Sequence, residues 1–395
     1  MSNIVLSASV RQNLLSLQST ADLLSTTQNR LATGNKVNSA LDNPTNFFTA
    51  QGLNNRASDI TNLLDSIGNG VQVLQAANTG LTSLQKLVDT AKSIANQVLQ
   101  APAGYSTKSS VTSGAITGGT AANLLGTGLA QSDALTIAAT GGGTAVTITF
   151  GTGAAEVDTL AELNAALSTN NLQASVDDAT GKITITTTND AASATVGALS
   201  GTATGAGKAF LAASVTTVAK VADTASLASR AGLVKQYNDI ITQITTTSQD
   251  ASFNGINLLN GDDLKLTFNE TGKSTLNVKG VTFNAAGLGL ASLTSGTDFL
   301  DNSSANAALT KLSAASGMLR TQASALGSNL SIVQIRQDFN KNLINVLQTG
   351  SSNLTLADTN EEAANSQALS TRQSIAVSAL ALANQSQQSI LQLLR

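Results

Sequence analysis

Residues 365–395 have the sequence NSQALSTRQSIAVSALALANQSQQSILQLLR, and this stretch decides the fold. Its positions at alternating steps of four and three have the heptad spacing of a helix that packs along another helix. This seam consists of Leu369, Gln373, Ala376, Leu380, Ala383, Gln387, Ile390 and Leu394. Between Ile375 and Ala383 every residue except Ser378 is apolar, so apolar surface surrounds the helix there. A helix that is apolar all round must itself be surrounded.

The apolar run is too short to cross a membrane, because a spanning helix needs about 20 apolar residues. Asn384 and Gln385 follow it at once. We therefore expect other protein segments, and not lipid, around this helix.

The beginning of the chain has a matching seam. Residues 4–32 are predicted to form a helix whose seam is Val10, Leu14, Leu17, Ala21, Leu24, Gln28 and Leu31. Because the two seams mirror each other, we expect the two terminal helices to pair. Gly34 is expected to end the first helix, since glycine tolerates the left-handed conformation found just beyond a helix end.

A polar connector, residues 35–43, follows Gly34 and includes Asn38 and Ser39. Asp42 and Asn43 stand directly before Pro44, which is the pattern of a capping side chain and a proline at the first turn of a helix. The next helix is therefore predicted to begin at Pro44.

Long helices follow the connector. Heptad spacing predicts one helix from Pro44 to about Gln100, on the order of 80 Å long, and further helices over residues 227–244 and 309–347. The last of these is predicted to end at Gly350 and Ser351, and the terminal helix to begin after Asp358. Strands are predicted at residues 264–268 and 276–283.

Residues 101–220 differ in composition and are rich in Gly, Thr, Ser and Ala. Alternating runs predict strands at residues 134–140, 144–150, 174–177 and 182–188, with one helix at 158–168 and a hairpin turn at 178–182. We expect a small β-rich domain inserted between the helices. For its flanks, residues 103–120 and 197–215, low-complexity disorder is the alternative.

Composition excludes several classes of site. The chain has no Cys, His or Trp, so disulfides, thiolate nucleophiles, imidazole bases and zinc sites built on Cys or His are excluded. Charged residues make up 11% and lack a basic run, which gives nucleic-acid binding little support. A low charge suits dense packing of identical copies, although it also fits an ordinary low-charge soluble protein. Residues 1–6 lack the features of a secretory signal, so any export is expected to use another route.

The candidate chemical sites have simpler interpretations. Asp177 and Asp178 could suggest a carboxylate site, but because they precede Thr-Gly they are expected to be turn residues. Glu361 and Glu362 could suggest a metal pair but are expected to complement the dipole of the terminal helix. Residues 141–143, Gly-Gly-Gly, lack the Gly-Lys-Ser/Thr of a phosphate loop and are expected to form a hairpin turn. For the Thr- and Ser-rich residues 107–120, O-linked sugars and a solvated linker remain equal alternatives. We expect no catalytic, cofactor, metal or small-molecule site.

Three motifs in order give a resemblance to a known family. Residues 31–43, LATGNKVNSALDN, resemble L-S-S-G-x-R-I-N-S-A-x-D-D; residues 253–259, FNGINLL, resemble F-N-G-x-x-L-L; and residues 379–395 resemble A-x-A-N-Q…L-x-L-L-R. The chain resembles bacterial flagellin over residues 1–100 and 222–395.

The resemblance implies a mainly α fold with long antiparallel coiled-coil-like helices from both chain ends, a β-hairpin and an inserted β-rich α+β domain. It implies that residues 1–43 and 352–395 line the core of a hollow filament. Residues 44–100 and 221–351, with the hairpin 264–283, would form the rod around that core, and residues 101–220 would face outward. The implied function is a self-polymerising, non-enzymatic subunit of the extracellular flagellum.

The resemblance also implies partners: further copies of the chain, an export chaperone, and filament cap and junction proteins. Export would take place unfolded through the flagellar type III apparatus, with no nucleic acid, membrane span or cofactor. We expect the terminal helices, residues 1–33 and 357–395, to become ordered on assembly. The alternatives are a hook–filament junction protein of the same family and, more remotely, an enzyme carried on the insert.

Two features depart from the family pattern. Familiar members place the F-N-G segment and its hairpin before the variable part, whereas here the insert comes earlier in the chain. The innate immune receptor that reads many flagellins recognises L-Q-R-x-R-E-L-A, and the matching residues 84–91 are LQKLVDTA. Lys86 and Val88 replace arginines, Asp89 replaces a glutamate, and Thr90 replaces a leucine. Because lysine lacks the planar fork of arginine, recognition is expected to be weak.

Overall fold

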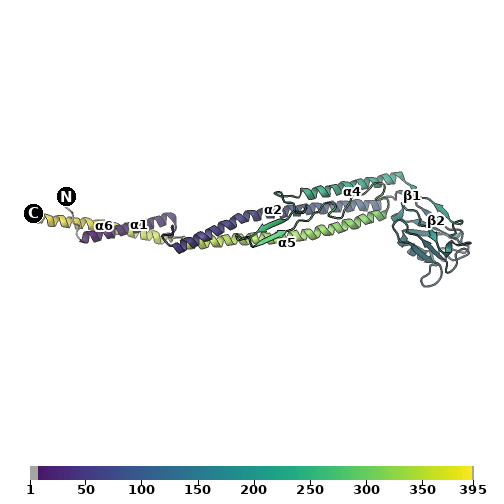
Figure 1. The fold of residues 1–395 in the computed structure, drawn as a ribbon, viewed down its shortest axis with the longest axis horizontal. Helices are drawn as coiled ribbons and strands as arrows, with labels where there is room; N and C mark the ends of the chain where they lie inside the picture. The colour runs from purple at the N-terminus through teal and green to yellow at the C-terminus, as the bar shows by residue number, and fades with distance from the viewer. Residues whose placement is uncertain (1–7, 394–395) are drawn as a thin grey trace. The chain divides into compact units, whose positions relative to one another are not determined.

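The structure is a computed structural model that describes residues 8–393, apart from the side chains of Gln387 and residues 390–393. Ile390 and Leu394 of the predicted C-terminal seam therefore lie outside what is described. Most of the described chain is helical, and small antiparallel sheets occupy its middle region (Figure 1). The predicted mainly α fold with a β-rich insert is confirmed.

The α-helices are α1 (Ala8–Thr33), α2 (Pro44–Gln100), α3 (Leu160–Leu167), α4 (Thr224–Asp250), α5 (Asn302–Thr355) and α6 (Thr359–Leu393). The strands are β1 (Tyr105–Thr107), β2 (Ser110–Thr112), β3 (Ala134–Ile137), β4 (Val146–Thr149), β5 (Leu172–Asp177), β6 (Lys182–Thr187), β7 (Leu199–Ser200), β8 (Thr216–Val218), β9 (Val221–Ala222), β10 (Leu264–Thr267) and β11 (Thr275–Val278). Helix α2 begins at Pro44 as predicted, and Asn43 Oδ1 accepts the amide of Asn46 at 3.0 Å to cap it.

Packing divides the chain into two units. The first comprises residues up to Val71, Lys265–Asn277 and the chain from Ser331 onward; the second comprises Gln72–Leu264 and Val278–Leu330. Helices α2 and α5 each contribute to both units. The boundaries therefore run through helices, and the three-part division made from the sequence stays a proposal about roles in assembly.

In the first unit α2 and α5 share an apolar seam. Ala57 and Ile60 of α2 pack with Ile344 and Leu347 of α5. Strand β10 lies against α2 at Gly70, where a Cβ atom would come within 2.3 Å of Leu266 Cδ2. The glycine therefore leaves room for the Leu266 side chain, which would have to shift if a Cβ atom were present, although glycine costs about 1 kcal/mol in a helix.

Helix α5 ends later than predicted. It continues through Gly350 and Ser351 to Thr355, so the prediction of an end at Gly350 was wrong. Ser351 is buried and its Oγ donates to the Ala50 carbonyl on α2 at 3.1 Å. Packing against α2 thus outweighs the weak helix preference of a single glycine. The break follows at Leu356, whose neighbours bond to the connector.

In the second unit a buried arginine joins several segments. Arg230 of α4 is 2% exposed. Its guanidinium donates to the carbonyls of Pro102 at 2.8 Å, Phe299 at 2.9 Å and Ala101 at 3.1 Å. Burial lowers the pKa of this guanidinium from its usual value, partly countered by Asp301. Arg230 therefore fixes the end of α2 and the segment before α5 against α4.

The insert contains a four-stranded sheet in the order β5-β6-β2-β8 and a three-stranded sheet in the order β4-β3-β7. The predicted hairpin is confirmed, with Asp177 opposite Lys182. Gly141 and Gly142 have positive φ in the turn between β3 and β4, as expected for a hairpin turn. Helix α3 starts with a capping box between Thr159 and Glu162. The strands are in part shorter than predicted.

The flanks of the insert are folded, although their composition did not decide between order and disorder. Ile116 and Phe210 are 1% exposed and belong to the insert core, where Phe210 stacks on Phe150 with centroids 6.5 Å apart. The predicted strand at residues 276–283 ends at Val278. Beyond it Val281 and Phe283 donate their amides to Leu258 and Leu259 instead.

Candidate assembly surface

The terminal helices α1 and α6 pack side by side in the first unit (Figure 1). Between residues 363 and 389, the described α6 side chains that are not exposed are Ser366, Leu369, Gln373, Ala376, Leu380 and Ala383, and each is only half-buried. This is the heptad seam that the sequence indicates. A single partner helix therefore covers one narrow stripe of α6.

The seam on α1 is less regular. Val10 is buried, and Leu17, Ala21 and Leu24 are half-buried, whereas Leu14 and Leu31 are exposed. Near its end α1 instead buries Thr27 and half-buries Arg30. An apolar pattern could not reveal these two polar positions. For Arg30, the burial accompanies an ion pair with Glu362 at the start of α6.

The pair leaves large apolar side chains uncovered. On α6, Ile375 is 63% and Leu382 is 69% exposed; on α1, Leu15 is 63% and Leu23 is 53% exposed. Val377 is exposed as well. Apolar surface of this extent on two neighbouring helices is typical of a surface that another protein segment covers.

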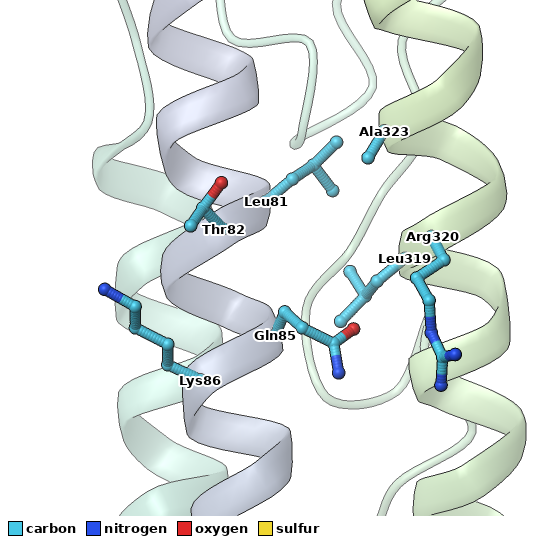
Figure 2. A pocket seen from close by; sticks show the side chains of 7 residues that line it. All are labelled: Leu81, Thr82, Gln85, Lys86, Leu319, Arg320 and Ala323. Carbon is cyan, nitrogen blue, oxygen red and sulfur yellow. The ribbon is translucent and has the colours of Figure 1, made fainter.

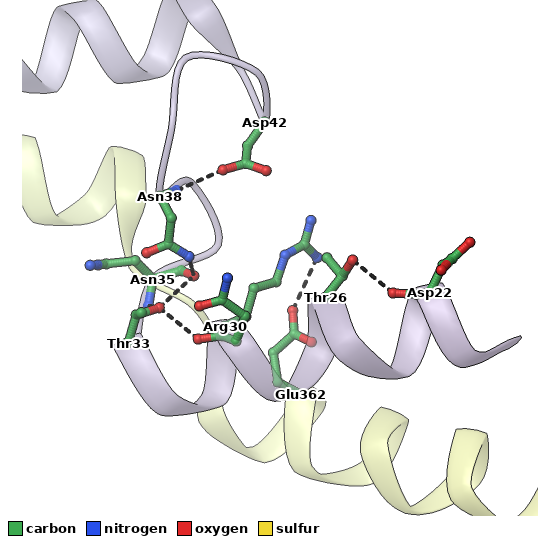
Figure 3. A network of polar contacts seen from close by, with 9 residues as sticks. Asp22, Thr26, Arg30, Thr33, Asn35, Asn38, Asp42 and Glu362 are labelled. Carbon is green, nitrogen blue, oxygen red and sulfur yellow. Dashed lines mark hydrogen bonds and ion pairs between the residues drawn. The ribbon is translucent and has the colours of Figure 1, made fainter. Parts of the chain in front are cut away.

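An ion pair joins the helices where α6 begins. Arg30 Nη1 donates to Glu362 Oε1 at 3.2 Å, and the Glu362 side chain is 11% exposed (Figure 3). Both Glu361 and Glu362 lie in the first turn of α6, where carboxylates complement the helix dipole as expected. Glu362 has the additional role of tying α6 to α1, which the sequence did not indicate.

The connector is held by its own polar groups and by the break between α5 and α6. Gly34 has φ +69°, the left-handed conformation expected at a helix end. Its carbonyl accepts the amide of Ala357 at 2.9 Å, and the amide of Lys36 donates to Thr355 at 2.7 Å. The end of α1 and the break between α5 and α6 are therefore joined by antiparallel backbone hydrogen bonds.

Asp42 organises the remainder of the connector. Its Oδ2 accepts the amide of Asn38 at 2.9 Å (Figure 3). The same oxygen accepts the amide of Ser39 at 2.8 Å and the Ser39 hydroxyl at 3.1 Å. The amide donations of Ser39 and Asn38 lower the pKa of this carboxyl from its usual value. Leu41, 96% exposed, stands on this fixed turn. Leu41 is an apolar residue in a polar connector, which marks it as a candidate contact residue, and the sequence analysis did not identify it.

Comparison with known proteins identifies the architecture. Residues 3–118 match the bacterial flagellin N-terminal helical region, and residues 309–394 match the bacterial flagellin C-terminal helical region. The two matches cover the terminal helices that form the pair and most of α2 and α5. The chain belongs to the bacterial flagellin family. Flagellins are structural, non-enzymatic subunits of the extracellular flagellar filament.

Similar flagellins occur in Caulobacter vibrioides. Flagellin FljM is 34% identical over 168 residues, 41% of this chain and 59% of the relative. Flagellin FljK is 32% identical over 166 residues, with the same shares, and flagellin FljO is 33% identical over 175 residues, 43% of this chain and 62% of the relative. The matches thus span about three fifths of these relatives' lengths.

The stretch equivalent to the flagellin receptor motif lies on α2 in the second unit. Leu84, Val88 and Ala91 are fully buried, whereas Lys86, Asp89 and Thr90 are exposed. Gln85 points toward α5, and its Nε2 donates to Ser316 Oγ at 2.8 Å (Figure 2). Val88 therefore cannot contact a receptor unless this part of α2 unpacks. The exposed side chains Lys86, Asp89 and Thr90 form the surface of this stretch.

The remaining candidates do not assemble a chemical site. Asp177 accepts the Thr180 hydroxyl at 2.7 Å and the Ala179 amide at 3.1 Å, which is a turn as predicted. Asp178 accepts the amide of Ala121 at 2.7 Å. Among the residues that the structure describes, no group of three or more acidic, His or Cys side chains could hold a metal ion. Within residues 8–393 no helix has the length and hydropathy needed to cross a membrane.

Proposed function

We propose that this chain polymerises with copies of itself into a flagellar filament, and that the outer faces of α1 and α6 are buried against neighbouring copies. The supporting observation is that these helices bury one narrow seam in the pair and leave Leu15, Leu23, Ile375 and Leu382 exposed. Neighbouring copies would provide the additional cover that the apolar run from Ile375 to Ala383 requires.

In this proposal the parts of the chain have distinct roles. Residues 1–43 and 352–395 line the filament core, residues 44–100 and 221–351 form the rod layer, and residues 101–220 face outward. The seam residues on the two terminal helices hold the pair together. The Asp42 turn and the joint between Gly34 and Ala357 set the direction in which each terminal helix leaves α2 or α5.

Assembly is coupled to ordering of the terminal helices. Fixing each residue costs about 1–2 kcal/mol of backbone entropy, while a half-buried seam returns only part of the about 1.5–3 kcal/mol available from a fully buried leucine. Contacts with further copies supply the difference. The terminal helices are therefore expected to be ordered most strongly within the filament.

The export chaperone, cap and junction proteins are proposed as partners from the family resemblance, and so is export through the type III apparatus. Absence of cysteine fits a chain that is threaded unfolded, because no disulfide can trap it. A junction protein of the same family is the second candidate, since it would share the terminal helices.

Electron microscopy of purified protein after seeding tests the proposal. Long tubes are expected from the native chain, whereas a junction protein would stop after a thin zone. Leu380→Asp, or deletion after Ala357, is expected to leave a folded rod that forms no tubes, because the α6 seam is lost. The matched variant Ser175→Asp, at an exposed position of the insert, separates loss of the seam from added charge. Normal filaments from Leu380→Asp would contradict the seam assignment.

A further inference from the structure

Edge strands of a sheet leave backbone donors and acceptors free to pair with another strand, so folded proteins usually cover them. The two insert sheets end at β5, β8, β4 and β7. Beside β5, Asn164 closes the edge, because its Oδ1 accepts the Ala174 amide at 2.7 Å and its Nδ2 donates to the Ala174 carbonyl at 3.1 Å.

The edge of β4 is also partly covered, since the amide of Val157 donates to the Thr149 carbonyl at 2.9 Å. Strand β7 has only two residues, Leu199 and Ser200. Strand β8 differs from β4 and β7. All its residues, Thr216, Thr217 and Val218, are exposed, and along residues 8–393 no comparable cover is found for its outer edge.

The edge also lacks charges that would deter pairing. Residues 209–222, AFLAASVTTVAKVA, contain Lys220 as their one charged residue. Lys220 is occupied elsewhere, because its Nζ donates to the Ser193 carbonyl and lies 5.3 Å from the centroid of the Tyr105 ring. An uncharged strand of high β propensity with a free edge invites strand addition.

An apolar groove of about 360 Å³ adjoins this edge. It is lined by uncharged residues only, including Val111, Leu199, Phe210, Val215 and Thr217. Thr217 stands opposite Val111 in the sheet, so both side chains lie on the groove side. A strand added beside β8 would direct its own groove-side residues toward Phe210 and Leu199.

We propose that β8 pairs with β8 of a second copy in antiparallel register centred on Thr217. This register places Thr217 opposite Thr217 of the other copy, Val215 opposite Ala219, and Thr216 opposite Val218. No like charges face each other, and paired threonines are favourable across strands. The contact is isologous, so each copy covers the groove of the other. The inference goes beyond filament assembly and concerns the insert alone.

Because the chain has no cysteine, single-cysteine variants test this register directly. Side chains opposite each other across antiparallel strands have Cβ atoms about 4.5–5.5 Å apart, close enough for a disulfide after a small shift. Under mild oxidation of unassembled full-length protein, Thr217→Cys is expected to form a disulfide-linked dimer at least about tenfold faster than the control Ser175→Cys. Ser175 is equally exposed but lies on the edge closed by Asn164.

A second measurement guards against chance collisions. Sedimentation of the native monomer is expected to show a dimer that grows with concentration and disappears in Thr217→Lys but not in Ser175→Lys, since two lysines would face each other in the proposed register. Circular dichroism of each variant checks that it is folded. Equal cross-linking at both positions, or a native chain that stays monomeric at every concentration, would overturn the proposal whether or not filaments form.

Discussion

Truncation of Leu382 gives the sharpest test of the exposed face of α6. The side chain is 69% exposed, so neighbouring copies would bury about two thirds of it on assembly. Full burial of a leucine contributes about 1.5–3 kcal/mol, which gives about 1–2 kcal/mol per subunit for the part that remains exposed in the monomer. At about 1.4 kcal/mol per factor of ten, Leu382→Ala is expected to raise the critical concentration for polymerisation about fivefold to thirtyfold.

The assay is sedimentation of seeded filaments, with the free subunit measured in the supernatant. Monomer stability should change by less than about 0.5 kcal/mol, because the side chain makes few contacts in the monomer and alanine favours the helix. Val281→Ala, at an exposed position of the second unit, is the control. A critical concentration for Leu382→Ala within twofold of the native value, about 0.4 kcal/mol, would refute the reasoning.

Three further predictions concern other parts of the chain. Arg230→Met leaves the buried carbonyl of Phe299 and the part-buried carbonyls of Ala101 and Pro102 without their donor. It is expected to lower the free energy of unfolding by about 3–5 kcal/mol in denaturant titrations, whereas Arg56→Met, at an exposed ion pair, should change it by less than about 1 kcal/mol. Asp42 has a lowered pKa, so its stabilisation of the connector is complete above the usual carboxyl pKa and is lost as the pH falls through the lowered value. The NMR amide shift of Ser39 should change over that acidic range. A shift that stays constant with pH, as in Asp42→Asn, would contradict this prediction. Purified monomer is expected to activate receptor-expressing cells weakly, and strong activation would disprove the effect assigned to Lys86.

Periodic apolar patterns were enough to predict most of the fold. The start of α2 at Pro44 and the β5–β6 hairpin both follow from local rules that packing did not override. Gly350 shows the opposite case. Its tendency to end a helix is worth only about 1 kcal/mol. The hydrogen bond that holds the helix together there joins Ser351 to Ala50, which are 301 residues apart in the sequence, so no local pattern could predict it.

The positions covered between α1 and α6 were predicted in part. The heptad on α6 identified the half-buried positions, because each depends only on the helical period. Thr27 and Arg30 are covered in place of Leu31. Arg30 pairs with Glu362, and such long-range polar contacts have no periodic signature. The sequence likewise did not show that the edge of β8 is free. That conclusion requires knowing that Asn164 covers the edge of β5 and that Val157 covers part of the edge of β4.

Amide hydrogen exchange in monomer and filament tests the central claim most directly. The account predicts that amides of α1 (Ala8–Thr33) and α6 (Thr359–Leu393) exchange rapidly in the monomer and become strongly protected in the filament. Amides of α2 between Ala77 and Val98, which line a buried seam in the monomer, should be protected in both states. Equal and strong protection of α1 and α6 in the monomer would contradict the coupling of assembly to the ordering of the terminal helices.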